Sequence, residues 1–330
     1  MRPPGRPKGE VRRAQPEGSL VSVDRRADGD TGPDRAPLAG LALAGIGAIA
    51  FSGKAIIVKL AYRYEGVDAV TLIMLRMLLA LPLFLLLAWW AGRGRPRLGA
   101  RDWRVVAGLG FSGYYLASFL DFLGLAYISA GLERLILYLN PTLVLALSVI
   151  LFGHRVRRAQ LAALAVSYVG VLLVFGHEAQ LQGANVVLGV VLVFASAVSY
   201  AVYLVFSGAE VRRLGALRLT GLASSVACVL CIVQYLVLRP PLAALALPAP
   251  VWWLSLLNAT VCTVAPVLLV MLAIERIGAT ATAQTGMIGP LSTIAMGVLI
   301  LGEPFTAWIA AGTALVLSGI WLLARSRPRS

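Results

Sequence analysis

Residues 68–91 read DAVTLIMLRMLLALPLFLLLAWWA, and only Asp68 and Arg76 in this run carry a charge. A helix needs about 20 apolar residues to cross the hydrocarbon core of a bilayer. Inside lipid, every backbone N–H and C=O group must be satisfied within the segment, which favours a helix over a strand. The run therefore predicts a transmembrane helix.

The whole chain has the composition of a membrane protein. Of its 330 residues, 59% are hydrophobic and 13% are charged, whereas soluble domains are about half apolar and a quarter charged. We predict an all-α integral membrane protein with ten transmembrane helices in a lipid bilayer, joined by short connections. The ten segments lie near residues 38–61, 68–91, 103–126, 130–152, 157–176, 185–207, 217–238, 251–274, 279–302 and 305–324.

The first 36 residues differ from the rest of the chain. Residues 1–36 contain five prolines, eight basic and six acidic residues, and almost no large apolar side chains. Such a segment cannot bury enough surface to offset the entropy of ordering. We expect a disordered cytoplasmic tail.

The basic residues indicate the orientation in the membrane. With the N-terminus inside, 23 of the 29 basic residues fall on the cytoplasmic side, and only Arg63 and Arg239 fall outside. Cytoplasmic loops carry the excess of lysine and arginine. The net charge of +14 therefore does not require a nucleic-acid partner. We expect a multi-pass protein of the bacterial cytoplasmic (inner) membrane with both termini in the cytoplasm. A homodimer is an alternative to a monomer.

The second half of the sequence repeats the first. A shift of 149 positions places Pro141 on Pro290 and Gly153 on Gly302, and we regard these four residues as structural hinge positions. Five helices per repeat is an odd number, so the two repeats must insert in opposite orientations. Inverted repeats are a feature of transporters, with the solute site near the midplane. The predicted repeats are residues 37–177 and 183–324.

Three stretches of the sequence resemble the EamA type of the drug/metabolite transporter superfamily. They are residues 75–79 (LRMLL), residues 131–141 (GLERLILYLNP) continuing to Gly153-His154, and residues 289–304, which end in LGEP. The resemblance implies two inverted five-helix repeats around a central cavity. It also implies amino acids, other small metabolites or drugs as substrates, often exported. The first copy departs from the pattern, because His154 stands where the family usually has glutamate.

Five charged residues lie within the predicted helices at one depth. Each charge inside a bilayer costs about 2.5–3.5 kcal/mol on insertion scales, so each needs a reason. Counting about 1.5 Å of rise per residue places all five in the outer half of the first repeat. They are Lys54, Arg76, Asp121, Glu133 and Arg134.

Two interpretations of these charges stay open. In the first, Lys54 pairs with Asp121 and Arg76 with Glu133, and the network only stabilises the repeat. In the second, Lys54, Arg76, Asp121 and Glu133 form a polar wall of the substrate cavity, and the excess positive charge receives a carboxylate.

Polar and aromatic residues extend the predicted binding region. Pro141 removes a backbone donor within its helix, and Asn140 stands beside it on the same face as Glu133. Tyr114 and Tyr203 are candidate cavity-lining residues, although tyrosine is also typical of the membrane interface. We therefore include Asn140, Tyr114 and Tyr203 among the substrate-binding residues.

The sequence does not indicate an enzyme. Its two histidines, His154 and His177, fall in loops on opposite sides, and Cys228-x-x-Cys231 lies within an apolar helix, where small residues pack. We expect no catalytic residues, metal or cofactor. The predicted function is transport, with export as the expected direction, of a small polar metabolite such as an amino acid. The mechanism would be alternating access between the repeats. A non-transporting scaffold or receptor, and less readily a membrane-embedded enzyme, are the alternatives.

Overall fold

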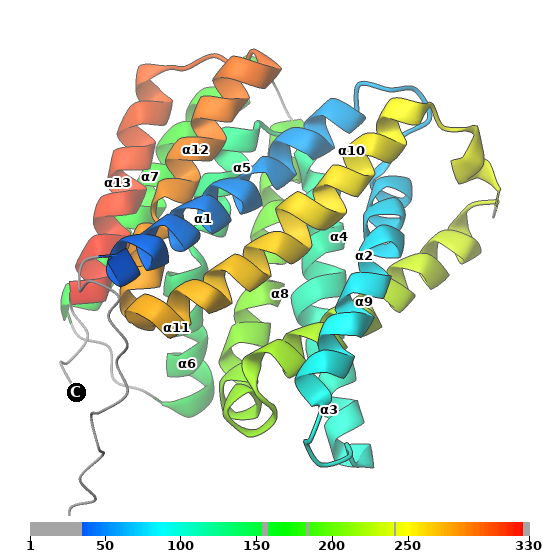
Figure 1. Cartoon of the computed structure of the whole chain (residues 1–330). Coiled ribbons are helices and arrows are strands. Elements are labelled where there is room, and N and C mark those ends of the chain that lie inside the picture. Colours follow the sequence, from blue (N-terminus) through cyan, green and yellow to red (C-terminus); the bar gives the residue numbers. More distant parts are fainter. Residues whose placement is uncertain (1–34, 154–157, 183–184, 241, 326–330) are drawn as a thin grey trace, which may run out of the picture. The chain divides into compact units, whose positions relative to one another are not determined.

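The computed structural model describes residues 35–153, 158–182, 185–240 and 242–325 (Figure 1). The described residues from Ala36 onward form one compact unit. His154 and all but the last two residues of the predicted tail lie outside the described residues. Within the described ranges the chain is helical and contains no strand.

Apolar helices account for the predicted segments. Eight are long and apolar enough to cross a membrane, and two shorter ones span Ile288–Leu301 and Ala307–Leu323. The elements are α1 (Arg35–Ala61), α2 (Ala69–Gly92), α3 (Ala100–Gly110), η1 (Phe111–Leu116), α4 (Ala117–Leu125), α5 (Ala130–Leu137), α6 (Asn140–Phe152), α7 (Arg158–Gln182), α8 (Asn185–Leu214), α9 (Ala216–Leu238), η2 (Ala243–Ala246), α10 (Ala249–Ala259), η3 (Thr260–Val264), α11 (Ala265–Thr285), α12 (Ile288–Met296), η4 (Gly297–Leu301) and α13 (Ala307–Arg325).

The backbone repeats itself at the spacing found in the sequence. Helix α3 and the π-helical turn η1 that follows it begin 149 positions before α10 and the π-helical turn η3. Gly153 and Gly302 end matched helices in the left-handed conformation, with φ of 65° and 74°, which glycine adopts without strain. The two halves therefore share the π-helical turns η1 and η3 and the glycine helix ends, whereas η4 (Gly297–Leu301) of the second half matches an α-helical stretch of α6 in the first.

Each half also contains a helix break before a matched proline. Tyr138 and Leu139 separate α5 from α6 in the first half, and Gly286 and Met287 separate α11 from α12 in the second. The breaks lie within one position of equivalence at the 149-residue shift. Irregular backbone at membrane depth is tolerated where protein or a wet cavity covers it.

Helices of opposite repeats pack closely at glycines. On α7 and α13, a Cβ added to Gly312 would lie 2.7 Å from the carbonyl oxygen of Gly170, and one added to Gly319 would lie 2.1 Å from Ser167 Oγ. Small residues let membrane helices approach at their backbones. The α7–α13 contact therefore joins the two repeats directly.

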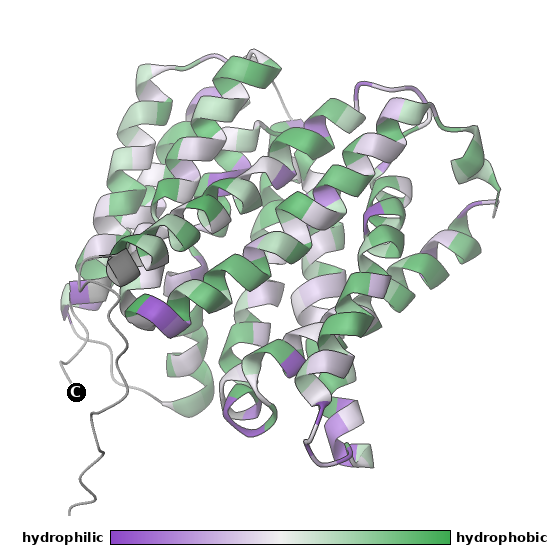
Figure 2. Cartoon of the chain, viewed as in Figure 1, coloured by the Kyte–Doolittle hydropathy of each residue, from purple (hydrophilic) through white to green (hydrophobic). Residues whose placement is uncertain are grey.

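Hydrophobic residues predominate along the helices, and many of the hydrophilic residues lie in or next to the connections (Figure 2). Large apolar side chains such as Trp89 and Leu299 are 59% and 83% exposed, which suits a surface in contact with lipid. Some hydrophilic residues lie within the helices, and the buried group around Lys54 forms the candidate site.

Candidate functional site

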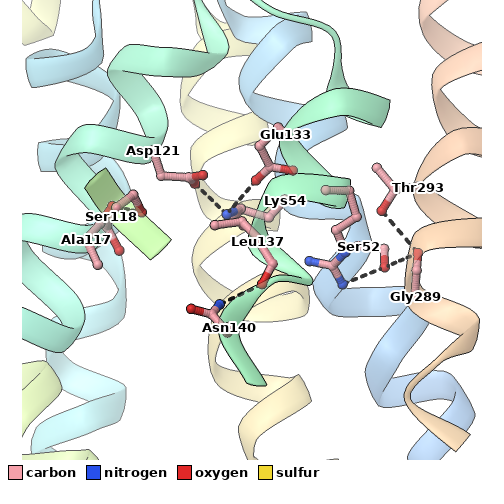
Figure 3. A network of polar contacts seen from close by, with 12 residues as sticks. Ser52, Lys54, Ala117, Ser118, Asp121, Glu133, Leu137, Asn140, Gly289 and Thr293 are labelled. Carbon is pink, nitrogen blue, oxygen red and sulfur yellow. Dashed lines mark hydrogen bonds and ion pairs between the residues drawn. The ribbon is translucent and has the colours of Figure 1, made fainter. Parts of the chain in front are cut away.

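Lys54 lies between two carboxylates at the centre of the site (Figure 3). Its Nζ atom is 2.5 Å from Asp121 Oδ2 and 3.1 Å from Glu133 Oε1. The three residues come from α1, α4 and α5 and are buried, with Glu133 fully inaccessible. The predicted contact between Lys54 and Asp121 is confirmed.

Arg76 of α2 does not pair with Glu133, so that predicted pair is wrong. The Arg76 guanidinium donates to Ser118 Oγ at 3.2 Å and lies over the Phe122 ring, 4.8 Å from its centroid. Both partners belong to the helical segment that carries Asp121. Lys54, with its long flexible side chain, reaches Glu133 instead.

Arg134 of α5 occupies a different setting from the other two cations. Its Nη2 donates to Ser52 Oγ at 3.0 Å, and its guanidinium lies 5.1 Å from the Phe51 ring centroid and 5.4 Å from that of Tyr138. No salt bridge to a carboxylate forms at Arg134 among the residues the structure describes. Arg134 is nevertheless only 5% exposed.

Side chains satisfy the carbonyl groups that the two prolines release. Asn140 Nδ2 donates at 2.7 Å to the Leu137 carbonyl, which Pro141 cannot pair. The Tyr138 hydroxyl donates at 2.7 Å to the Gly286 carbonyl, which Pro290 cannot pair. Pro141 and Pro290 thus mark two breaks that side chains of the first repeat complete.

Ser52 and Gly289 link the second break to Arg134. The Ser52 hydroxyl lies 2.9 Å from the Gly289 carbonyl oxygen, to which it donates. A Cβ at Gly289 would lie 2.5 Å from Tyr138 Oη and 2.9 Å from Arg134 Nη2. A larger residue at this position would have to displace the ends of both side chains. Ser52 was not among the predicted site residues, and Pro290 was the sequence signal for irregular backbone near its partner Gly289.

The charges of this group do not balance. Three buried cations, Lys54, Arg76 and Arg134, face two buried carboxylates, Asp121 and Glu133. Several of their buried atoms have no hydrogen-bond partner, whereas buried polar groups are nearly always paired. Among the described residues these atoms are Arg76 Nε, Arg134 Nε, Asp121 Oδ1, Glu133 Oε2 and Asn140 Oδ1. Glu133 Oε1 has only its ion-pair contact with Lys54. The group retains capacity for both donors and acceptors of a small polar molecule.

Tyr114 and Tyr203 form a separate aromatic pair. Their hydroxyl oxygens are 3.2 Å apart and their ring centroids 5.1 Å apart. Tyr203 also stacks on Tyr200, and the pair packs among apolar residues that include Leu109 and Leu219. Within the described part of the chain, no hydrogen bond, ion pair or ring contact joins Tyr114 or Tyr203 to the charged group.

Metal ligands do not gather in the described ranges. No three histidine, cysteine, aspartate or glutamate side chains lie close enough there to hold an ion. Cys228, Cys231 and Cys262 are free and buried. His177 stacks on Trp308, with 5.9 Å between ring centroids.

The sequence matches the family profile described as the EamA-like transporter family over residues 38–176, and again over residues 187–325. The chain belongs to the EamA-like transporter family. The resemblance inferred from the LGEP and GLERL stretches is confirmed, together with the two-repeat architecture. A multi-pass membrane protein follows from this membership and from the apolar helices.

Curated relatives carry transporter names. "Uncharacterized transporter YcbK" of Bacillus subtilis (strain 168) is 34% identical over 273 residues, covering 78% of this chain and 84% of the relative. An "Uncharacterized transporter" of Archaeoglobus fulgidus is 26% identical over 235 residues, covering 70% of this chain and 81% of the relative. One solved structure, titled "Crystal structure of protein", matches with a TM-score of 0.56 and 19% identity. The match covers 88% of this chain and 98% of the chain in that structure, and it supports the fold alone.

Proposed function

We propose that this EamA-like protein exports a small polar metabolite that carries a carboxylate, such as an amino acid, by alternating access between its two repeats. The charged group around Lys54 is the proposed solute site. Export is the direction that the family resemblance implies. The names of the relatives support transport but specify neither substrate nor direction.

The observation that carries the proposal is the excess of one buried cation. A buried charge is stable only when paired, and Arg134 has a hydroxyl and two aromatic rings around it in place of a carboxylate. A solute carboxylate would balance the group. A guanidinium binds a carboxylate through two parallel hydrogen bonds, and the Nε of Arg134 is available for one of them.

The helix breaks support alternating access. Tyr138 and Ser52 of the first repeat bond to carbonyl groups at the break in the second repeat. A solute held at Arg134 would therefore touch the hydrogen bonds that connect the repeats. We propose that the turns at Pro141, Pro290, Gly153 and Gly302 take up the backbone rotation between the two states.

We also propose the orientation and membrane given by the charge distribution. Both termini would be cytoplasmic, in a bacterial inner membrane, so that the end of α1 near Arg63 faces outward. The repeat boundaries proposed are residues 37–177 and 183–324. The solute site would then lie in the outer half of the first repeat.

A purely structural ion network is the competing interpretation, and Arg134 separates the two. Purified protein in proteoliposomes would be tested for efflux of pooled radiolabelled amino acids and small carboxylates, with empty vesicles as the blank. Arg134→Gln removes the excess cation without breaking a described salt bridge, so we expect lost flux and retained folding. Arg218→Gln is the matched control, because Arg218 is also buried and its one hydrogen bond within the described part of the chain is to the Pro96 carbonyl. Undiminished flux in Arg134→Gln would overturn the proposed site.

A further inference from the structure

A pocket with charged residues in its lining lies at the end of α1, beyond the charged group. Its volume is about 380 Å³, and both signs of charge line it. Among the lining residues are Lys59, Arg63, Ser129, Glu178 and Glu303. The pocket is not part of the solute site described above.

The pocket lies farther along two of the helices that carry the charged site, α1 and α5. Lys59 follows Lys54 by five residues on α1, and Ser129 precedes Glu133 by four at the start of α5. At about 1.5 Å per residue, these steps are about 6–8 Å along the helix axes. Val58, one turn beyond Lys54 on the same face of α1, is completely buried in the hydrophobic core that also contains Ala61 and Phe122.

Glu303 of the second repeat contacts the first repeat at this pocket. Its backbone turns back after η4, where its N–H donates to the Gly297 carbonyl at 3.0 Å. Its Oε1 accepts the backbone N–H of Ala130, the first residue of α5, at 2.9 Å, and lies 3.9 Å from Lys59 Nζ. A Cβ at Gly297 would lie 2.8 Å from Glu303 Oε2, so the carboxylate occupies the space that the glycine leaves. One side chain of the second repeat thereby contacts both α1 and α5 of the first.

Glu178 binds the same helix start from within the first repeat. Its carboxylate accepts hydrogen bonds from the Ser129 hydroxyl and, at 3.3 Å, from the Ser129 backbone N–H. A carboxylate is favourable at a helix N-terminus, where free N–H groups point outward. Glu178 and Glu303 therefore both stabilise α5, but only Glu303 joins the repeats.

We infer that this pocket is the outer end of the solute path, and that Glu303 is the latch that keeps it closed off from the charged site. The identification of a path rests on the proposed function. To connect the pocket with Lys54, the segment bearing Glu303 must release Ala130 and Lys59. Arg63 adds to the closure, because its guanidinium donates to the Leu301 carbonyl at 2.9 Å.

The test measures access to a cysteine at position 58, and it needs no solute. Val58→Cys would be introduced with Cys228, Cys231 and Cys262 replaced by alanine, and right-side-out vesicles would be treated with a membrane-impermeant maleimide. We expect slow labelling with Glu303 present. Glu303→Ala should raise the labelling rate about tenfold, the change in an open-to-closed ratio that loss of one charge-assisted hydrogen bond produces. Glu178→Ala, the matched control, should leave the rate unchanged.

Equal rates in Glu303→Ala and Glu178→Ala would overturn the latch, since both would then act only as helix caps. A rise seen only in inside-out vesicles would overturn the outer placement. If Glu303→Ala elutes as aggregate on size exclusion, Gly297→Ala replaces it, because its methyl group displaces the carboxylate and should give the same rise. The flux assay with Arg134→Gln is independent of this labelling rate, so failure of the latch and failure of the solute site are distinguishable.

Discussion

The hydroxyl of Tyr138 donates a hydrogen bond to the carbonyl oxygen of Gly286, from the break in the first repeat to the break in the second. Gly286 is the residue whose carbonyl Pro290 would pair if proline had a backbone N–H group. The Gly289 N–H donates to the same carbonyl at 2.9 Å, and Tyr138 of the first repeat supplies a second donor. This bond stabilises the broken helix and the contact between the repeats at once.

Replacing Tyr138 with phenylalanine should destabilise the protein by about 0.5–1.5 kcal/mol, because it removes one of two hydrogen bonds to the Gly286 carbonyl and leaves the one from the Gly289 N–H. The measurement is the thermal unfolding midpoint of purified protein in detergent. Tyr200→Phe serves as the control, since the Tyr200 ring stacks on Tyr203 and phenylalanine preserves this stacking. Equal midpoints for the two variants would show that the Gly286 carbonyl does not depend on Tyr138.

Asn140 and Pro141 make a second prediction, in the form of a double-mutant cycle. Asn140→Ala removes the side-chain donor to the Leu137 carbonyl and should cost about 1–2 kcal/mol. In a Pro141→Ala background, the restored backbone N–H can pair that carbonyl, so the same substitution should cost much less. Unfolding of the four proteins in detergent gives the coupling energy. Additive effects would mean that Asn140 does not compensate for the proline.

The lipid environment explains why the helices and the repeat were predictable. Apolar runs such as residues 68–91 leave the backbone no other way to satisfy its hydrogen bonds. Proline and glycine have backbone requirements of their own, so Pro141, Pro290, Gly153 and Gly302 retained the signature of the repeat. Estimating depth from a fixed rise per residue also correctly predicted that Lys54 contacts Asp121.

Depth counting could not predict the direction in which each side chain points. The π-helical turn η1 precedes Asp121 and changes the angular phase of the residues after it, which a period of 3.6 residues does not anticipate. Arg76 consequently meets Ser118 and Phe122 in place of Glu133. Ser52 was missed for another reason, because its partner at Gly289 lies 237 residues away in the sequence.

Asp68 makes a prediction about pH. It caps α2 by accepting the Thr71 N–H at 2.8 Å and also binds Arg239 at the end of α9. Burial alone would raise the pKa of Asp68, but the hydrogen bonds from Thr71 and Arg239 hold the pKa below its usual value. The stabilisation is therefore present above pH of about 4 and is lost as the pH falls through the lowered pKa.

Asp68→Asn isolates this effect, because asparagine retains the cap but not the charge. The pair is substantially exposed, so we expect a loss of less than about 1 kcal/mol at pH 7. Between pH 6 and pH 3, the unfolding midpoint of the variant should fall less than that of the parent. Parallel curves would assign the acid sensitivity to other carboxylates.

The proposed orientation predicts the positions of reporter fusions. Alkaline phosphatase is active outside the cytoplasm and green fluorescent protein folds inside it, so the two report opposite faces. Fusions after residues 95 and 328 should report the cytoplasm, and a fusion after residue 179 should report the outside. A cytoplasmic signal at residue 179 would contradict five helices per repeat and would also place the Glu303 pocket on the inner face.

The last prediction concerns how Lys54 is shared between Asp121 and Glu133. Because its ammonium group contacts both carboxylates, Asp121→Asn or Glu133→Gln alone leaves it one partner. Each single variant should therefore fold with a modest loss of stability. The double variant leaves a buried lysine without a carboxylate, and breaking a buried pair costs about 3–5 kcal/mol. The loss should thus exceed the sum of the two single losses.

Adding Lys54→Met to the double variant removes the uncompensated ammonium and should recover part of the stability, although Arg76 and Arg134 remain. Unfolding midpoints of the five proteins in detergent check this. If the stability loss of the double variant does not exceed the sum of the two single losses, the two carboxylates act independently of Lys54. The same conclusion follows if Lys54→Met recovers no stability in the double variant.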